Sequence, residues 1–148
     1  MKISSQAAGV AGEYFVAAEL SRRGHVASIS LRNARGIDII ATNQAAAHSV
    51  TIQCKTNRHG DKYWILNKEC ETVRAVNHFY IFVVLGDVHD RPIYHIVPSR
   101  VVAKCIRTSH QQYLKEPGRC GRQHADSSMR IFSDHNNTYL ERWDLLGL

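Results

Sequence analysis

The stretch FYIFVVLG, residues 79–86, is the feature that most constrains how this chain folds. It is an uninterrupted apolar run of strand length. A strand in which polar and apolar residues do not alternate is expected where a sheet is covered on both faces. The segment PIYHIVP, residues 92–98, follows across the turn-rich GDVHDR and predicts a second core strand. Other elements must therefore pack on both faces of a sheet.

The elements around these two strands are predicted from spacing and turn residues. Apolar residues recur at helical spacing from Gln6 to Arg23, where Gly24 ends the helix. Further along, we predict strands over 25–32, 37–42 and 50–56 as a three-stranded meander, a short helix over 68–77, a helix from Pro98 to about Glu116, a loop over 117–128, a strand over 129–132 and a closing helix over 136–146 with Tyr139, Leu140 and Trp143 inward. This order predicts one α/β domain over residues 1–148, a sandwich with a mixed central sheet of about five strands flanked by helices.

The charge of the chain points to a polyanionic partner. Nineteen Lys and Arg against thirteen Asp and Glu give a formal charge of +6, to which nine His can add. Charge alone leaves the partner open, because many basic proteins bind no nucleic acid. The apolar fraction of 44% and the charged fraction of 22% exclude disordered, collagen-like and coiled-coil classes.

The N-terminal region has no long uncharged apolar run, so we expect neither a signal peptide nor a membrane span, and a cytoplasmic setting. Cys54, Cys70, Cys105 and Cys120 are widely spaced without a CxxC pair, and we expect four free thiols. A zinc site that draws on Cys105, Cys120 and His124 is the alternative, although the spacing matches no common zinc pattern.

Polar residues occur where strands favour apolar ones. In VTIQCKTN, residues 50–57, the amide of Gln53 and the ammonium of Lys55 share one face of the predicted strand. Asp38 lies within GIDII, and a carboxylate is disfavoured inside a strand. If the two strands pair as a hairpin, Asp38 can lie beside Gln53 and Lys55. Alternatively, Asp38 enters the strand and caps the turn after Gly36.

Glu13 shares a column of the first helix with Val10, Ala17 and Leu20, so its carboxylate is predicted to point toward the sheet. The alternative is a glutamate on the helix surface. Glu13, Asp38 and Lys55 together have the composition of a phosphodiesterase site. Carboxylates hold a hard divalent cation, which polarises a phosphoryl oxygen and acidifies bound water, while an ammonium orients that water or neutralises developing charge.

Three short motifs in this order carry a family resemblance. Gly12-Glu13 on the helix, Gly36-Ile37-Asp38 opening a strand and Gln53-Cys54-Lys55 ending the next resemble the PD-(D/E)XK nuclease superfamily, in a QxK variant form. The likeness is closest to small single-domain members such as Holliday-junction resolvases and intron-encoded homing endonucleases. It covers about the first 57 residues, and it implies a restriction-endonuclease-like fold.

The resemblance also implies roles for individual residues. Asp38 would be the central metal ligand, Gln53 would occupy the second acidic position, and Lys55 would be the catalytic lysine. Glu13 would be the helix carboxylate, and the backbone carbonyl of Cys54 would complete the metal shell. The implied activity is divalent-metal-dependent endonucleolytic hydrolysis of DNA, with Mg²⁺ as cofactor, Mn²⁺ as a substitute and no other small-molecule cofactor.

Two positions depart from the family pattern. Ile37 stands where the superfamily has proline, and Gln53 replaces an Asp or Glu, which removes one negative charge and leaves a neutral oxygen donor. Either the site is active and Glu13 supplies the missing charge, or it has become a catalytically inactive module that binds nucleic acid or a partner protein. The joint presence of Glu13, Asp38 and Lys55 favours activity.

Further residues near these motifs are expected to contact DNA through phosphates or by stacking. They are Arg32, Arg35, Asn57, Arg58, His59 and Lys62, beside Tyr63 and Trp64. The alternatives are ordinary turn charges and a solvated loop that Trp64 anchors to the core. A late group, Arg119, Arg122 and Arg130, is either a second DNA-binding element or a solvated face. We expect a homodimer, because two-fold assemblies are the commonest oligomers and a duplex has two strands.

Overall fold

The predicted core strand is β5 (His78–Val84), and all seven of its residues are buried. In the computed structural model, which describes residues 3–30, 35–58 and 60–148 apart from the side chain at 119, β5 lies between β3 (Ser49–Asn57) and β6 (Ile93–Pro98). It pairs parallel with β3 and antiparallel with β6. The prediction that this strand is covered on both faces is confirmed.

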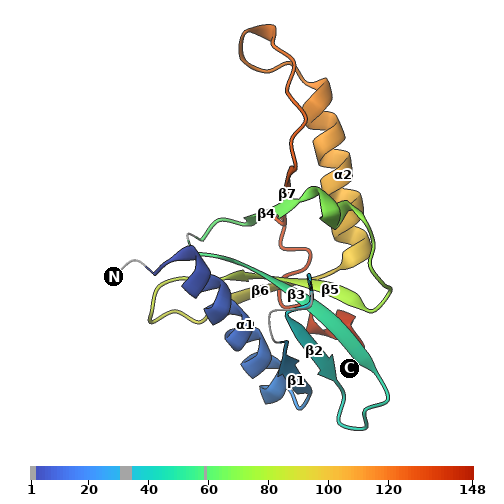
Figure 1. Ribbon diagram of the computed structural model, residues 1–148. Helices are drawn as coiled ribbons and strands as arrows, with labels where there is room; N and C mark the ends of the chain where they lie inside the picture. Colours follow the sequence, from blue (N-terminus) through green and yellow to red (C-terminus); the bar gives the residue numbers. More distant parts are fainter. Residues whose placement is uncertain (1–2, 31–34, 59) are drawn as a thin grey trace.

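The main sheet continues beyond β3 through two short strands. β2 (Ile39–Thr42) pairs antiparallel with β3, and β1 (Val26–Ile29) pairs antiparallel with β2. The strand order is β1-β2-β3-β5-β6, in which only the β3–β5 pair is parallel. The predicted meander and the predicted mixed five-stranded sheet are therefore confirmed (Figure 1).

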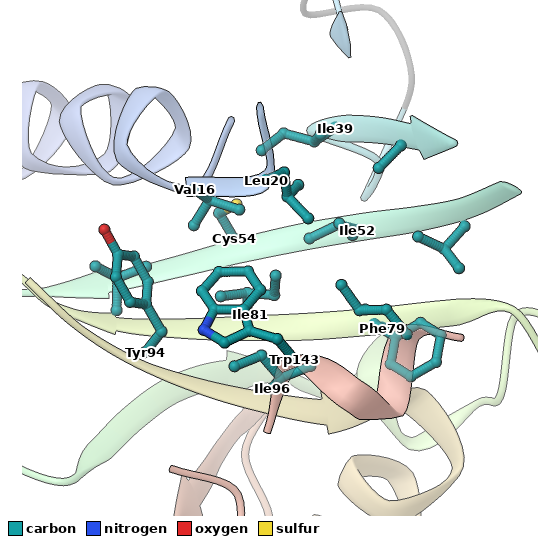
Figure 2. Packing of buried hydrophobic residues seen from close by; sticks show 14 residues of the cluster. Val16, Leu20, Ile39, Ile52, Cys54, Phe79, Ile81, Tyr94, Ile96 and Trp143 are labelled. Atoms are coloured by element: carbon teal, nitrogen blue, oxygen red, sulfur yellow. The ribbon is translucent and has the colours of Figure 1, made fainter. Parts of the chain in front are cut away.

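Helix α1 (Ser5–Arg22) covers one face of this sheet. Ser4 caps its start, since the Ser4 hydroxyl oxygen accepts a hydrogen bond from the Ala7 N–H at 3.1 Å. Figure 2 shows Val16 and Leu20 of the helix above Ile52, and Trp143 of the C-terminal segment beside Ile81 and Ile96 in the same cluster. This apolar core fixes the position of α1 against β2 and β3.

The other face is covered by helix α2 (Ser99–Lys115) and a second, two-stranded sheet that we did not predict. The small sheet consists of β4 (Tyr63–Asn67) and β7 (Met129–Ser133) in antiparallel register. β7 confirms the predicted strand over 129–132, whereas β4 was not predicted, because its five residues follow a polar loop and their alternation of exposed and buried residues is not clear from the sequence. Phe82 and Phe132 stack with ring centroids 4.5 Å apart, joining the two sheets. Figure 1 shows α2 extending away from the main sheet.

Two predicted helices are wrong. The segment 68–77 forms only the 3₁₀ turn η1 (Lys68–Glu71), and the segment 136–146 forms only η3 (Trp143–Leu146). A further 3₁₀ turn, η2 (Arg119–Gly121), lies in the predicted late loop. Trp143 is buried as predicted, but it reaches the core from a turn.

The C-terminal segment is not helical because other groups take its backbone hydrogen bonds. The Asp134 carboxylate accepts the N–H groups of Thr138 and Tyr139 at 2.9 Å each. The Ile96 N–H then donates to the Tyr139 carbonyl at 3.0 Å, so the chain runs beside β6. Asn137 and Glu141 adopt positive φ angles of 56° and 53°, which end any helix there.

Within the described residues, no helix is long and apolar enough to cross a membrane. All four cysteines are free thiols, with Cys54 and Cys70 buried and Cys105 and Cys120 exposed. Over the same residues, no three His, Cys, Asp or Glu side chains gather where they could hold a metal ion, so Cys105 and Cys120 form no zinc cluster with His124.

Candidate active site

Asp38 enters the sheet immediately before β2 and already takes part in strand pairing. Its N–H donates to the Ile52 carbonyl at 2.8 Å, and its carbonyl accepts the Ser30 N–H at 2.8 Å. Ile39 pairs with Ile52, so continuing the antiparallel register by one residue puts Asp38 opposite Gln53. The hairpin anticipated from the sequence therefore forms, with Asp38 at the strand entry.

The carboxylate of Asp38 is half-buried and incompletely compensated. Its Oδ2 accepts the backbone N–H of Cys54 at 2.7 Å. Burial raises the pKa of Asp38 above its ordinary value, and the Cys54 hydrogen bond and the charge of Lys55 offset only part of that rise. A positive charge beyond those the protein supplies would therefore stabilise the ionised carboxylate.

Strand β3 separates its apolar residues from its polar ones. Ile52 and Cys54 are buried in the core beneath α1, whereas Gln53 and Lys55 are half-buried and face away from it. Gln53 and Lys55 line a polar cleft of about 420 Å³. The other residues that line it are Arg35, Gly36, Asn67, Glu69, Cys70, Thr72, Arg74 and Tyr80.

Gly12 brings α1 unusually close to β3 at the same end of the strand. A Cβ atom at Gly12 would lie 1.9 Å from Oγ1 of Thr56, which no side chain tolerates without movement. The buried stripe of α1 consists of Ala8, Gly12, Val16, Glu19 and Leu20. Glu13 is half-buried at the margin of this stripe, next to the point of closest approach.

Three of the predicted site charges act on one buried atom, the Sγ of Cys54. Burial is the main cause that raises the pKa of this thiol well above its ordinary value. The charges of Asp38 and Glu13 raise it further, whereas the charge of Lys55 lowers it. Glu13, Asp38 and Lys55 therefore come within electrostatic reach of the same point, although they belong to a helix, a strand entry and a strand.

Glu19, which the sequence patterns did not single out, is the more deeply buried carboxylate of α1, at 7% exposed. Its Oε1 lies 2.8, 3.0 and 3.1 Å from guanidinium nitrogens of Arg22, Arg23 and Arg91. The hydrogen bond from Arg22 is the main cause that lowers the pKa of Glu19. The spacing of Glu19, Arg22 and Arg23 at i, i+3 and i+4 was the signal that could have revealed this cluster.

Arg74 is a cation of the cleft that sequence reasoning also missed. Its Nη1 donates to the Arg35 carbonyl, so it holds the turn that leads to Asp38. Arg74 and Arg35 are 39 positions apart in sequence, and no pattern in the sequence joins them. Arg35 itself lines the cleft, as expected for a residue beside the site.

The basic loop after β3 borders a second cleft of about 310 Å³ that Lys55 also lines. Asn57 donates through Nδ2 to the Tyr63 carbonyl at 3.2 Å, and Arg58 donates to the carbonyl of Ile3. Lys62 is half-buried. Arg32 and His59 lie outside the described residues.

Burial decides between the alternative roles of Trp64 and of Arg130. Trp64 is 3% exposed and donates through Nε1 to the Val83 carbonyl at 3.2 Å, so it anchors the core as the alternative held. Arg130 of the late group is buried, and its Nε donates to Glu71. Arg130 therefore belongs neither to a solvated face nor to a DNA-binding loop.

Comparison with known proteins identifies the fold. No protein-family model and no curated protein sequence matches this chain. Among solved structures, a bacterial homing endonuclease is similar with a TM-score of 0.59 at 11% identity, covering 99% of this chain and 94% of its own. A Holliday junction resolvase from the archaeal hyperthermophile Archaeoglobus fulgidus reaches a TM-score of 0.48 at 14% identity, covering 85% of this chain and 84% of its own. The fold expected from the motifs is thus confirmed, because the chain shares the α/β fold of the bacterial homing endonuclease over nearly its whole length.

Proposed function

We propose that this protein is a divalent-metal-dependent endonuclease that hydrolyses DNA phosphodiester bonds. The observation that carries the proposal is the Asp38 carboxylate, which is half-buried, has a raised pKa and lies within electrostatic reach of Lys55 at a polar cleft. A carboxylate that lacks full compensation beside an ammonium is suited to hold a cation and a phosphate together.

The available donors fit a hard divalent cation. Asp38, Glu13, the Gln53 amide oxygen and the Cys54 carbonyl are oxygen ligands of the kind that Mg²⁺ prefers, and Mg²⁺ commonly takes one or two carboxylates and completes its shell with water and phosphate oxygens. The raised pKa of Asp38 agrees with this fit, because a cation there would offset the cost of burying the charge. When bound, Mg²⁺ or Mn²⁺ would polarise the phosphoryl oxygen and acidify a water molecule.

The chain's own groups supply the remaining steps. The Lys55 ammonium at the cleft would neutralise charge that develops on the phosphate oxygens and orient the attacking water. Gln53 would offer the cation its amide oxygen without adding charge, and Glu13 would supply the second carboxylate. The hydrogen bond from the Cys54 N–H would hold the Asp38 carboxylate in a fixed orientation.

The surrounding cations extend the proposal to the substrate. Arg35 at the first cleft, Asn57 and Arg58 at the second, and Lys62 from the same loop would contact DNA phosphates on either side of Lys55. Arg32 and His59 belong to the same proposal by sequence position. We treat residues 1–148 as one nuclease-like domain that acts as a homodimer, so that each copy cuts one strand of a duplex.

The test is a cleavage assay on supercoiled plasmid, branched DNA and RNA, each with magnesium, with manganese and with chelator. Cleavage of a DNA substrate that needs added metal is the expected result. Lys55→Ala is the control for contaminating nucleases, because it should remain folded and still bind DNA while losing cleavage. Binding without cleavage under every metal condition would favour the inactive binding module instead.

A further inference from the structure

Helix α2 carries a row of cations with no acidic residue among them. Its residues Ser99–Lys115 include four Lys or Arg and no Asp or Glu. Arg100, Lys104, Arg107 and Lys115 are all exposed, and with Gln111 they recur at intervals of three or four, which places them on one flank of the helix. We call these four cations the basic stripe.

The stability of the helix does not account for this stripe. Arg100 lies in the first turn, where the helix dipole favours acidic residues. The Arg100–Lys104 and Lys104–Arg107 pairs place like charges at helical-neighbour spacing, which is unfavourable. Among the described residues, none of the four forms a salt bridge. The stripe is therefore an uncompensated positive surface.

The stripe starts beside the candidate active site. Ser99 donates through Oγ to the Ala75 carbonyl at 3.2 Å, and Ala75 follows Arg74, which lines the cleft with Lys55. Farther along the helix, Arg107 donates through Nη2 to the Glu71 carbonyl at 2.5 Å. Glu71 ends η1, whose residues 69 and 70 also line that cleft. From there α2 continues away from the main sheet (Figure 1).

The dimensions and chemistry of the stripe suit a duplex. From Arg100 to Lys115 the helix rises about 22 Å, which corresponds to about six or seven base pairs of B-DNA. Proteins that bind single strands combine cations with aromatic stacking, and the stripe holds no aromatic residue. A straight row of cations instead matches a stiff duplex that presents phosphates at regular spacing.

We propose that α2 is a second DNA-binding element, whose basic stripe holds the phosphate backbone of the duplex that leads to the cleft. The inference rests on the proposed function for its choice of polyanion. Contacts to phosphates alone give affinity without sequence preference. The stripe therefore fixes the direction in which the duplex leaves the site.

The test measures binding in chelator, where no cleavage occurs. A labelled duplex of about 20 base pairs is titrated with wild type and with Lys104→Gln/Lys115→Gln over a range of salt concentrations, using fluorescence anisotropy. Because each lost phosphate contact lowers the salt slope by about 0.9, the slope should fall by about 1.8 and the affinity at low salt at least tenfold. Arg107 is left intact because it also bonds to the Glu71 carbonyl.

The matched control is Arg91→Gln/Arg142→Gln, which removes the same charge from the β5–β6 loop and the C-terminal segment. Because Arg91 pairs with Glu19, urea denaturation must first show that this variant is folded under the binding conditions. It should leave the slope almost unchanged. Equal losses of duplex affinity in the two double variants would overturn the proposal, because net charge would then explain the effect. If Lys104→Gln/Lys115→Gln lost as much affinity for a single strand of the same length as for the duplex, the proposal would also be overturned, because the stripe would not select duplex backbone.

The two proposals can fail separately. If the stripe variant loses duplex binding but wild type cuts no DNA under any metal condition, the stripe stands and the nuclease proposal fails. If wild type cuts DNA and the stripe variant binds as tightly as wild type, the nuclease proposal stands and the stripe fails.

Discussion

Glu19 is buried and Asp38 is half-buried, and their charges are balanced in opposite ways. Three arginines surround Glu19, and its pKa is lowered. Asp38 receives one backbone hydrogen bond and the influence of one lysine, and its pKa is raised. The first arrangement stabilises the fold by itself. The second leaves negative potential that a ligand can use, which separates a structural carboxylate from a candidate catalytic one.

The largest expected effect is on cleavage. Asp38→Asn should reduce the rate on the order of a hundredfold or more, because it removes charge that the proposed site needs most in the transition state. The free energy of unfolding should stay the same or rise, since the amide oxygen can still accept the Cys54 N–H without the cost of a buried charge. The measurements are plasmid cleavage and urea denaturation. A variant that cuts at the wild-type rate would place Asp38 outside the site.

Glu19→Gln should have the reverse profile. It leaves Arg22, Arg23 and Arg91 without their shared carboxylate, and we expect the free energy of unfolding to fall by about 2 kcal/mol, a value kept moderate because the guanidinium groups reach water. Cleavage of folded protein should stay within twofold of wild type. Asp144→Asn is the control, because it breaks an exposed pair with Arg142 and should not measurably shift the urea midpoint. Unchanged stability in Glu19→Gln would remove the contrast with Asp38.

Gly12→Ala sharpens the comparison by disturbing only the end of α1 that carries Glu13. The new Cβ would overlap Oγ1 of Thr56 and would also lie 3.1 Å from Cβ and 3.2 Å from Cγ2 of that residue, so rotation of the Thr56 side chain alone does not clear the contact and α1 must shift. We expect the unfolding free energy to fall by about 1 to 3 kcal/mol. Cleavage should fall further than stability predicts, since Glu13 moves with the helix. Gly9→Ala is the control: nothing lies within 4 Å of its Cβ, so the unfolding free energy should rise by up to about 1 kcal/mol. Identical results for the two glycines would argue against a required close approach.

Gln53→Glu tests whether the site accepts more negative charge. If Gln53 faces the cation, the carboxylate should tighten magnesium binding several-fold, because it adds Coulombic attraction at the same reach. Calorimetric titration should rank Gln53→Glu above wild type and wild type above Asp38→Asn. Should all three proteins bind magnesium alike, Gln53 and Asp38 do not face a common cation.

The smallest effect is an opposite pH dependence of the two carboxylates. Glu19 has a folded pKa below its ordinary 4.5, so its stabilising contribution is present above 4.5 and is lost as pH falls through the folded value. Asp38 has a folded pKa above its ordinary 3.8, so stability is lost as pH rises from 3.8 through the folded value. Urea denaturation between pH 3 and 6 measures the free energy of unfolding of each variant relative to wild type. The loss in Glu19→Gln should shrink as pH falls, and the gain in Asp38→Asn should grow as pH rises toward neutrality. Parallel curves would contradict the difference in charge balance.

Short-range patterns in the sequence determined much of this protein. The apolar run at 79–86 predicted a strand buried on both faces, because a sheet residue covered on either side must be apolar. The period of two in VTIQCKTN put Gln53 and Lys55 on one face, and the ordered motifs predicted the nuclease-like fold. The closing helix over 136–146 was wrong, because Asp134 and strand β6 take the hydrogen bonds that a helix would use.

Only the tertiary structure decided which charges are balanced. Helical periodicity made Glu13 the inward carboxylate of α1, yet Glu19 is the more buried one, and Arg91 reaches it from 72 positions away and helps to balance its charge. Arg74 joins the cleft across 39 positions for the same reason. Such contacts depend on the packing of distant segments, whereas sequence periodicity reports only which neighbours along one element share a face.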